Sequence, residues 1–186
     1  MGGCQRPDQP NLVLIGYRAT GKTSVGARLA EVLRRPFVDF DQVLVQEAGQ
    51  TIAEIVAQEG WPEFRRREKE LVARFRRTRG QVLATGGGVV LDPDNVAALR
   101  ENGIIIWLTA APDLIQARLS QAQPLDTNRP SLTGSDTIRE VTEVLESRFP
   151  HYQAAAHLTV DTTNRDIAQV VDLVLAALEE HGNHGG

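Results

Sequence analysis

The sequence predicts a three-layer α/β/α fold built on a five-stranded parallel sheet. One pattern in the sequence favours it. Segments of helical periodicity alternate with short apolar runs, which lie at 11–16, 37–39, 81–85, 104–108 and 158–160. This alternation is typical of parallel strands joined by helices that cover both faces of the sheet. In such sheets a ligand binds beyond the carboxyl ends of the strands, so the residues that follow each strand are the candidates for a site.

The length and composition indicate one ordinary globular domain. The chain has 186 residues, of which 41% are hydrophobic and 24% charged, and we place the domain at 11–180, with flexible tails at 1–10 and 181–186. No apolar run approaches the roughly 20 residues of a bilayer span, and the first residues lack the apolar core of a signal peptide. The single cysteine, Cys4, excludes an internal disulfide framework. We expect a cytoplasmic monomer that binds no membrane, and the net charge of −4 argues against nucleic acid.

The first strand leads into the most specific motif of the chain. Gly16, Gly21, Lys22 and Thr23 have the spacing of a P-loop, between a strand and a helix that we expect over 21–34. Backbone N–H groups of such a loop and the positive end of the helix dipole attract phosphate oxygens. Lys22 can reach the β- and γ-phosphates and the Thr23 hydroxyl can bind Mg²⁺. The residues expected around a nucleoside triphosphate are Gly16, Ala19, Thr20, Gly21, Lys22, Thr23 and Ser24.

The second strand ends in the acidic triplet 39–41. Alternation along a strand would place Asp39 and Asp41 on one side and turn Phe40 away. One carboxylate could then hold Mg²⁺ through water while the other contacts a substrate hydroxyl. The structural alternative is that Asp41 caps the helix that follows it. A neighbouring P-loop favours the functional interpretation, because a bound triphosphate needs a metal partner on an adjacent strand.

Three helical segments follow, over 42–48, 52–59 and 62–78. Residues 65–79 contain eight of the twenty lysines and arginines. Glutamates interrupt this run and one helical face is apolar, so we expect most of these charges to face solvent and not nucleic acid. Arg65 lies at the edge of the apolar face and is the arginine expected to point into a cleft.

Three consecutive glycines, Gly86 to Gly88, follow the third strand. Three glycines in a row favour a backbone that approaches a ligand closely and offers it N–H groups. The alternative is a tight turn, which would need only one or two glycines.

The remaining helices are expected over 93–101, 112–121, 136–148 (with an extension to 156 left open) and 165–180. Between the second and the third of them lies a polar, aperiodic loop at 122–135, which carries Arg129. Phosphoryl-transfer enzymes use such mobile loops to bring an arginine onto the triphosphate. The alternative, which is more frequent in proteins generally, is an ordinary surface arginine in a flexible loop.

Taken in order, these motifs match a known family. Besides GYRATGKT at 16–23 and DFD at 39–41, the chain has ATGGG at 84–88, Arg129-Pro130, and Arg148 four residues before Tyr152. In this order and spacing the chain resembles the shikimate kinases, P-loop kinases of the nucleoside-monophosphate-kinase type, over about 11–178. The resemblance implies that ATP, with Mg²⁺, phosphorylates the 3-hydroxyl of shikimate in the chorismate pathway. The alternatives are a kinase for another polyol acid, such as gluconate, and a non-catalytic nucleotide-binding homologue.

The resemblance also implies roles for single residues. Asp41 would hold shikimate hydroxyls and act as the base, and Asp39 would support Mg²⁺ through water. Arg65 and Arg148 would clamp the substrate carboxylate, to which guanidinium forks are suited. Further implied are a pocket lining by Gly86, Gly87 and Gly88, a catalytic lid arginine at Arg129 beside Lys22, and an adenine neighbour at Arg165.

Two departures from the family pattern carry expectations. Ala19 stands where the family often has glycine, which is tolerable if its φ stays negative. The segment between Arg118 and Arg129 is longer than usual, which argues against an adenine-side role for Arg118.

Overall fold

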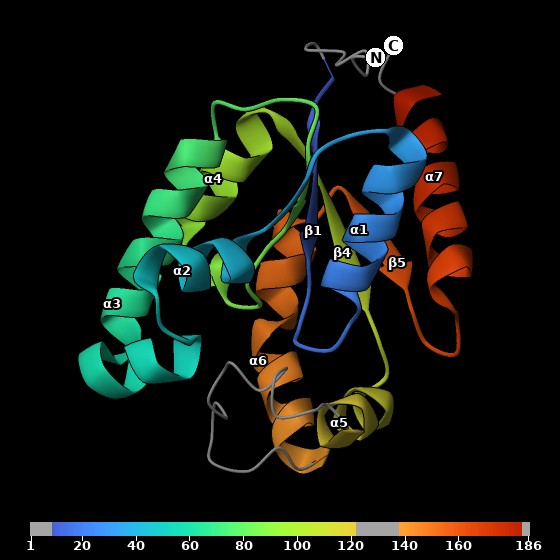
Figure 1. Ribbon diagram of the computed structural model, residues 1–186. Coiled ribbons are helices and arrows are strands. Elements are labelled where there is room, and N and C mark those ends of the chain that lie inside the picture. Colours follow the sequence, from blue (N-terminus) through green and yellow to red (C-terminus); the bar gives the residue numbers. More distant parts are fainter. Residues whose placement is uncertain (1–8, 122–137, 184–186) are drawn as a thin grey trace.

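A computed structural model describes residues 9–121 and 138–183. Its centre is a five-stranded parallel sheet in the order β2-β3-β1-β4-β5 (Figure 1), so the predicted fold class is confirmed. The central strand pairs Leu12 with Val82 on one side and with Ile104 on the other. The strands are β1 (Asn11–Ile15), β2 (Phe37–Asp39), β3 (Val82–Ala84), β4 (Gly103–Thr109) and β5 (Leu158–Asp161).

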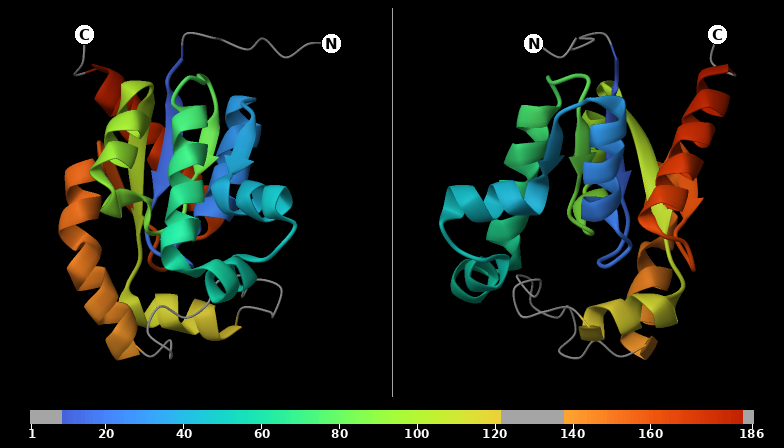
Figure 2. Two further views of the ribbon diagram at one scale, coloured as in Figure 1. Left: turned by 90° about the vertical axis from the view of Figure 1, so that its left-hand side faces the viewer. Right: turned by 45° about the vertical axis from the view of Figure 1, so that its right-hand side comes forward.

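Helices cover both faces of the sheet (Figure 2). Successive residues of β1 face opposite sides: Leu12 and Leu14 pack with α1 and α7, whereas Val13 and Ile15 pack with α2, α3, α4 and α6. Because both faces are covered, the inner strands β1, β3 and β4 are almost continuously apolar, whereas the edge strand β5 alternates apolar and polar residues. The helices are α1 (Lys22–Leu33), α2 (Phe40–Ala48), α3 (Ile52–Phe75), α4 (Pro93–Glu101), α5 (Pro112–Gln121), α6 (Ile138–Ala155) and α7 (Ile167–Asn183).

The structure contains the helical segments predicted between β2 and β3. Those expected over 52–59 and 62–78 together make up α3, in which Gly60 (φ 83°, ψ 167°) is not helical and separates two helical stretches, the second of which ends at Phe75. The predicted cap is present, since the Glu54 N–H donates to Thr51 Oγ1 and the Thr51 N–H donates to Glu54 Oε2. A short 3₁₀ helix over Val89–Leu91 was not predicted.

The expected tails are shorter than the sequence indicated. Helix α7 continues to Asn183, three residues into the segment predicted as a tail. At the other end, Arg35 donates hydrogen bonds to the Pro10 carbonyl (3.0 Å) and to the side chain of Gln9.

The predicted lid at 122–135, with Arg129, lies outside the described residues. None of the helices within them combines the length and the apolar character that a bilayer span requires.

The basic run on α3 is neutralised by acidic neighbours. Arg66 and Arg67 both pair with Glu63, and Lys69 pairs with Asp92 and Asp94. These exposed ion pairs agree with the prediction that most of the charges of this helix face solvent.

Candidate active site

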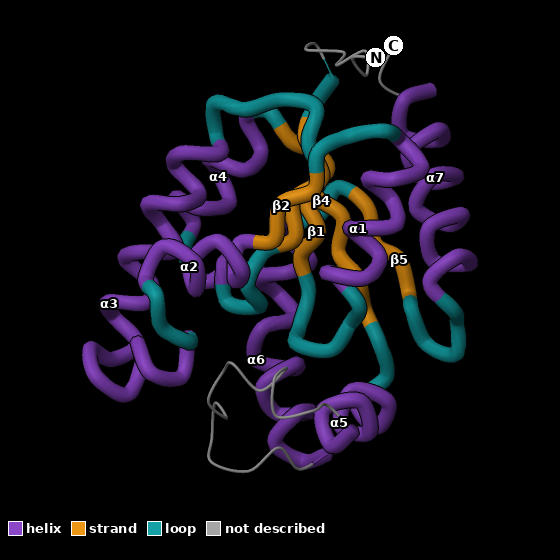
Figure 3. Tube along the Cα trace, viewed as in Figure 1, coloured by secondary structure: helices purple, strands orange, loops and turns teal. Residues whose placement is uncertain are grey.

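The loops that follow β1, β4 and β5 meet at one edge of the sheet (Figure 3). The phosphate-binding loop, residues 16–23, joins β1 to α1 there. Gly16 has φ 143°, and a Cβ at this position would lie 2.4 Å from the backbone oxygen of Leu108, so only glycine fits. The Lys22 ammonium lies across the loop and donates to the carbonyls of Gly16 (2.9 Å) and Tyr17 (2.7 Å). This geometry keeps a cation at the mouth of a loop of backbone amides.

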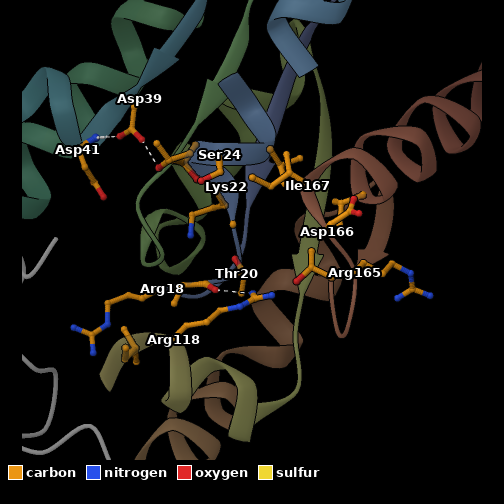
Figure 4. Close-up of a pocket in the computed structure, with 18 of the residues that line it drawn as sticks. Arg18, Thr20, Lys22, Ser24, Asp39, Asp41, Arg118, Arg165, Asp166 and Ile167 are labelled. Atoms are coloured by element: carbon orange, nitrogen blue, oxygen red, sulfur yellow. Dashed lines mark hydrogen bonds between the residues drawn. The ribbon is translucent and has the colours of Figure 1, made fainter. Parts of the chain in front are cut away.

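The loop opens into a pocket of about 600 Å³ (Figure 4). The pocket brings together residues from five parts of the chain: the loop, β2 with α2, the end of β3, α5, and the turn between β5 and α7. Nine of the predicted site residues line it, namely Ala19, Thr20, Gly21, Lys22, Thr23, Ser24, Asp39, Asp41 and Arg165. The Arg165 guanidinium donates to the Asp161 carbonyl and extends away from Lys22. Arg165 therefore faces the pocket with its backbone and not with its charged group.

Asp39 connects the loop to α2. Its Oδ2 accepts a hydrogen bond from the Thr23 hydroxyl at 2.6 Å, while its Oδ1 accepts from the N–H groups of Asp41 (2.9 Å) and Gln42 (3.3 Å). The predicted strand over 37–39 is confirmed, but the alternative that Asp41 caps the helix is wrong. Asp39 is itself the N-cap, and α2 begins at Phe40 and not at residue 42, so Asp41 lies in the first helical turn. Both carboxylates still line the pocket.

The donor set beside Lys22 fits Mg²⁺. A hydroxyl oxygen and a carboxylate oxygen lie next to each other at the end of a loop that suits phosphate. Mg²⁺ is usually held by one or two protein oxygens together with waters and substrate phosphates. Among residues 9–121 and 138–183, no group of three or more His, Cys, Asp or Glu side chains could form a complete protein cage. Thr23 and Asp39 therefore suit an ion that binds together with a nucleotide.

Arg65 belongs to α3, and three neighbouring side chains of the same helix hold its guanidinium. Its Nη1 lies 2.5 Å from Oε2 of Glu68, a carboxylate that is only 1% exposed. The guanidinium also lies 5.5 Å from the ring centroid of Trp61 and 5.2 Å from that of Phe64. A buried anion and two aromatic rings thus fix a cation that is itself 30% exposed. The prediction that this arginine differs from its solvated neighbours agrees with this environment.

The glycine run joins Arg65, Arg148 and the phosphate-binding loop. A Cβ on Gly88 would lie 2.1 Å from Nη2 of Arg65. The Gly87 carbonyl accepts hydrogen bonds from Arg148 Nη1 (3.3 Å) and from the Tyr152 hydroxyl (2.5 Å). A Cβ on Gly87 would also lie 3.3 Å from the Gly16 carbonyl oxygen. Gly86, Gly87 and Gly88 are all buried, and a side chain at position 88 would enter the space that the Arg65 guanidinium occupies.

One expectation about the loop is corrected by the structure. Ala19 does not keep a negative φ: its φ is 58°, in the left-handed region. Arg118, for which the long lid argued against an adenine-side role, lines the pocket, and its Nη1 donates to the Ala19 carbonyl at 2.9 Å. Nothing in the sequence indicated this hydrogen bond, which joins α5 to a loop residue 99 positions earlier.

A family model for shikimate kinase matches residues 18–179. The chain belongs to the shikimate kinase family. A shikimate kinase of Symbiobacterium thermophilum is 44% identical over 175 residues, which cover 94% of this chain and 99% of that protein. Membership of the shikimate kinase family makes the chain an ATP-dependent kinase with an alcohol as acceptor.

Solved structures agree with this family. Shikimate kinase from Acinetobacter baumannii, in complex with shikimate, superposes with a TM-score of 0.87 at 31% identity and covers 94% of this chain and 96% of its own. A gluconokinase from Sinorhizobium meliloti covers 96% of this chain and 97% of its own, with a TM-score of 0.59 at 19% identity, so it shares the fold alone. The shikimate kinase likeness is the stronger of the two.

Proposed function

We propose that the chain transfers the γ-phosphoryl group of ATP to the 3-hydroxyl of shikimate and releases shikimate 3-phosphate. The observation that carries this proposal is the position of Gly87. Its carbonyl binds Arg148 and Tyr152, and its Cα side faces the Gly16 carbonyl. The glycine run therefore lies between the phosphate-binding loop and the two arginines that would bind the acceptor, as transfer between two bound substrates requires.

The donor side of the reaction belongs to residues 16–24. The loop amides and the N-terminus of α1 would bind the phosphates, with Lys22 moving from its loop carbonyls onto the β- and γ-phosphates. Thr23 would bind Mg²⁺ directly and Asp39 would bind it through water. When bound, Mg²⁺ would neutralise charge on the phosphates. Arg165 would lie near the adenine, since its turn lines the same pocket.

The acceptor side belongs to α2, α3, α6 and the glycine run. Arg65 and Arg148 would bind the carboxylate of shikimate, and Asp41 would hold its hydroxyls and accept the proton of the attacking one. The first turn of α2 points Asp41 into the pocket that contains Lys22, which supports this role. Arg129 would complete the charge neutralisation from the lid; this remains a prediction from the sequence, as does a monomeric state.

The experiment that tests the proposed function is a coupled assay of ADP release with shikimate, with gluconate and without acceptor. Of the three conditions, we expect rapid ADP release only in the one that contains shikimate. Faster release with gluconate would favour the sister kinase, and equal, slow release in all three would indicate a nucleotide-binding protein without this activity. Arg65→Ala should raise the KM for shikimate and leave the KM for ATP nearly unchanged, because Arg65 lies outside the residues that line the nucleotide pocket.

A further inference from the structure

Ala19 has a strained backbone conformation within the phosphate-binding loop. Its φ of 58° lies in the left-handed region, which the Cβ of an L-residue disfavours and which glycine enters freely. The other two positive φ values of this loop fall on glycines, Gly16 and Gly21. A residue stays in such a conformation only when its surroundings hold it there.

Contacts from within the loop and from another helix hold Ala19. Within the loop, the buried Thr20 hydroxyl donates to the Tyr17 carbonyl at 2.8 Å. From α5, Arg118 Nη1 donates to the carbonyl of Ala19 itself at 2.9 Å, from a position 99 residues later in the chain. Figure 4 shows the Arg118 side chain extending beside the loop toward Thr20. The strained residue is therefore the one that the distant arginine binds.

The hydrogen bond from Arg118 sets the direction of a loop amide. The peptide unit between Ala19 and Thr20 is planar, and its C=O and N–H point in opposite directions. With the carbonyl turned toward Arg118, the Thr20 N–H points away from it. Rotation of Ala19 to a negative φ would swing this carbonyl away from Arg118 and redirect the amide. Loop amides are the groups that bind phosphate oxygens, so the rotation would weaken the phosphate site.

We propose that Arg118 is a positioning residue, whose hydrogen bond to the Ala19 carbonyl keeps the loop in the form that binds the triphosphate. Ala19 makes this hydrogen bond necessary, because glycine would hold the same conformation without help. The proposal rests on the proposed function in one respect, namely that residues 16–23 bind ATP. Attraction of phosphates by the guanidinium charge and contact with the adenine are two other ways in which Arg118 could act, and the test separates all three.

The test is a double-mutant cycle on Arg118 and Ala19. Arg118→Met removes the donors and keeps an apolar chain of similar length, and Ala19→Gly removes the Cβ. Isothermal titration calorimetry gives the Kd of ATP and of inorganic tripolyphosphate, which has no adenine, for the wild type, both single variants and the double variant. We expect R118M to weaken tripolyphosphate binding about tenfold in the wild-type background and by less than about threefold in the A19G background.

Two outcomes would overturn the proposal. An equal loss in both backgrounds would mean that Arg118 acts through its charge. A loss for ATP without a loss for tripolyphosphate would mean that it contacts the adenine. If the wild type bound neither ligand, the proposed function would fail as well. The titration of the wild type therefore tests the proposed function separately from the role of Arg118.

The matched control is Arg76→Met, which removes one positive charge at the end of α3, where Arg76 pairs with Glu101. We expect the Kd of tripolyphosphate to change by less than about twofold in this variant, because the charge lies outside the residues of the pocket. Thermal unfolding of each variant checks the fold, and Arg118→Leu, which also lacks a donor, replaces R118M should the latter fail to fold.

Discussion

Gly88 lies so close to Arg65 that a Cβ on the glycine would be 2.1 Å from the Nη2 atom of the arginine. The φ of Gly88 is −106°, so alanine can adopt its backbone. The three atoms nearest to that Cβ all belong to the end of the Arg65 side chain. Gly88→Ala should therefore displace the guanidinium without removing it and without unfolding the protein.

We expect Gly88→Ala to raise the KM for shikimate about tenfold or more, since a misplacement of about 1 Å in a positioning group can cost that much. The KM for ATP should stay within about twofold. Steady-state kinetics with each substrate varied gives both values. Gly182→Ala, at a helical position with nothing within 4 Å of the added Cβ, is the glycine control. An unchanged KM for shikimate in G88A would contradict the role of Arg65.

Asp39 caps α2 with one carboxylate oxygen and binds the Thr23 hydroxyl with the other, and substitutions can separate these two contacts. Asparagine keeps the Oδ1 acceptor that caps α2, whereas alanine removes it. We expect Asp39→Ala to lower the free energy of unfolding by about 1 kcal/mol and Asp39→Asn to leave it nearly unchanged. Both variants should lose activity, because each lacks the carboxylate beside Thr23. Urea unfolding followed by circular dichroism measures the difference, and equal destabilisation by the two substitutions would show that the cap contributes little.

Tyr152 is fully buried and its hydroxyl donates to the Gly87 carbonyl. Tyr152→Phe leaves the ring in place and removes the donor. Since Arg148 also donates to this carbonyl, we expect a loss of only about 1 kcal/mol in the free energy of unfolding, together with a higher KM for shikimate as the glycine run loosens. Urea unfolding and kinetics check the two effects. A stable variant with wild-type kinetics would mean that the hydroxyl does not hold Gly87.

His157 makes the stability depend on pH, at the opposite edge of the sheet. Its Nδ1 accepts a hydrogen bond from the Ile105 N–H at 2.9 Å, so this nitrogen must be unprotonated. Burial lowers the pKa of His157, and the positive charge of Arg100 and the ring of His181 lower it further. Since the folded pKa is below the unfolded value of about 6.5, the unfolded chain binds the proton first as pH falls. The stabilisation is thus complete above pH 6.5 and is lost as the pH falls toward the folded pKa.

We expect the wild type to lose about 0.5–1 kcal/mol more than His157→Asn between pH 8 and pH 5.5, because the ring is partly solvated and one hydrogen bond is at stake. Asparagine retains an acceptor near the position of Nδ1 and does not titrate. Urea unfolding at the two pH values measures the losses. Parallel losses in the two proteins would assign the pH dependence to other groups.

The sequence predicted those features that depend on local pattern. The apolar runs located the strands, and the topological rule placed the residues after β1, β2 and β3 at one edge of the sheet. Spacing alone was sufficient for Lys22 and Thr23, because the P-loop is a contiguous motif. The family resemblance, and not periodicity, supplied the roles of Arg65 and Arg148.

What the sequence did not predict depends on tertiary contacts. Strand alternation could not show that a helix begins directly after Asp39 and that Asp39, not Asp41, caps it. A negative φ was the reasonable expectation for Ala19, because the contact that opposes it comes from Arg118, 99 residues away. The Gly87 carbonyl, likewise, acquires its partners from α6. Patterns within one segment contain no information about such partners.

The central claim is that the two halves of this site transfer a phosphoryl group between them. Phosphorus NMR of the wild-type protein incubated with ATP, Mg²⁺ and shikimate tests it most directly. The account predicts ADP together with one new phosphomonoester signal, coupled to the proton on carbon 3 of shikimate. A mixture in which ATP persists, or in which ADP appears with inorganic phosphate and no phosphomonoester, would contradict it.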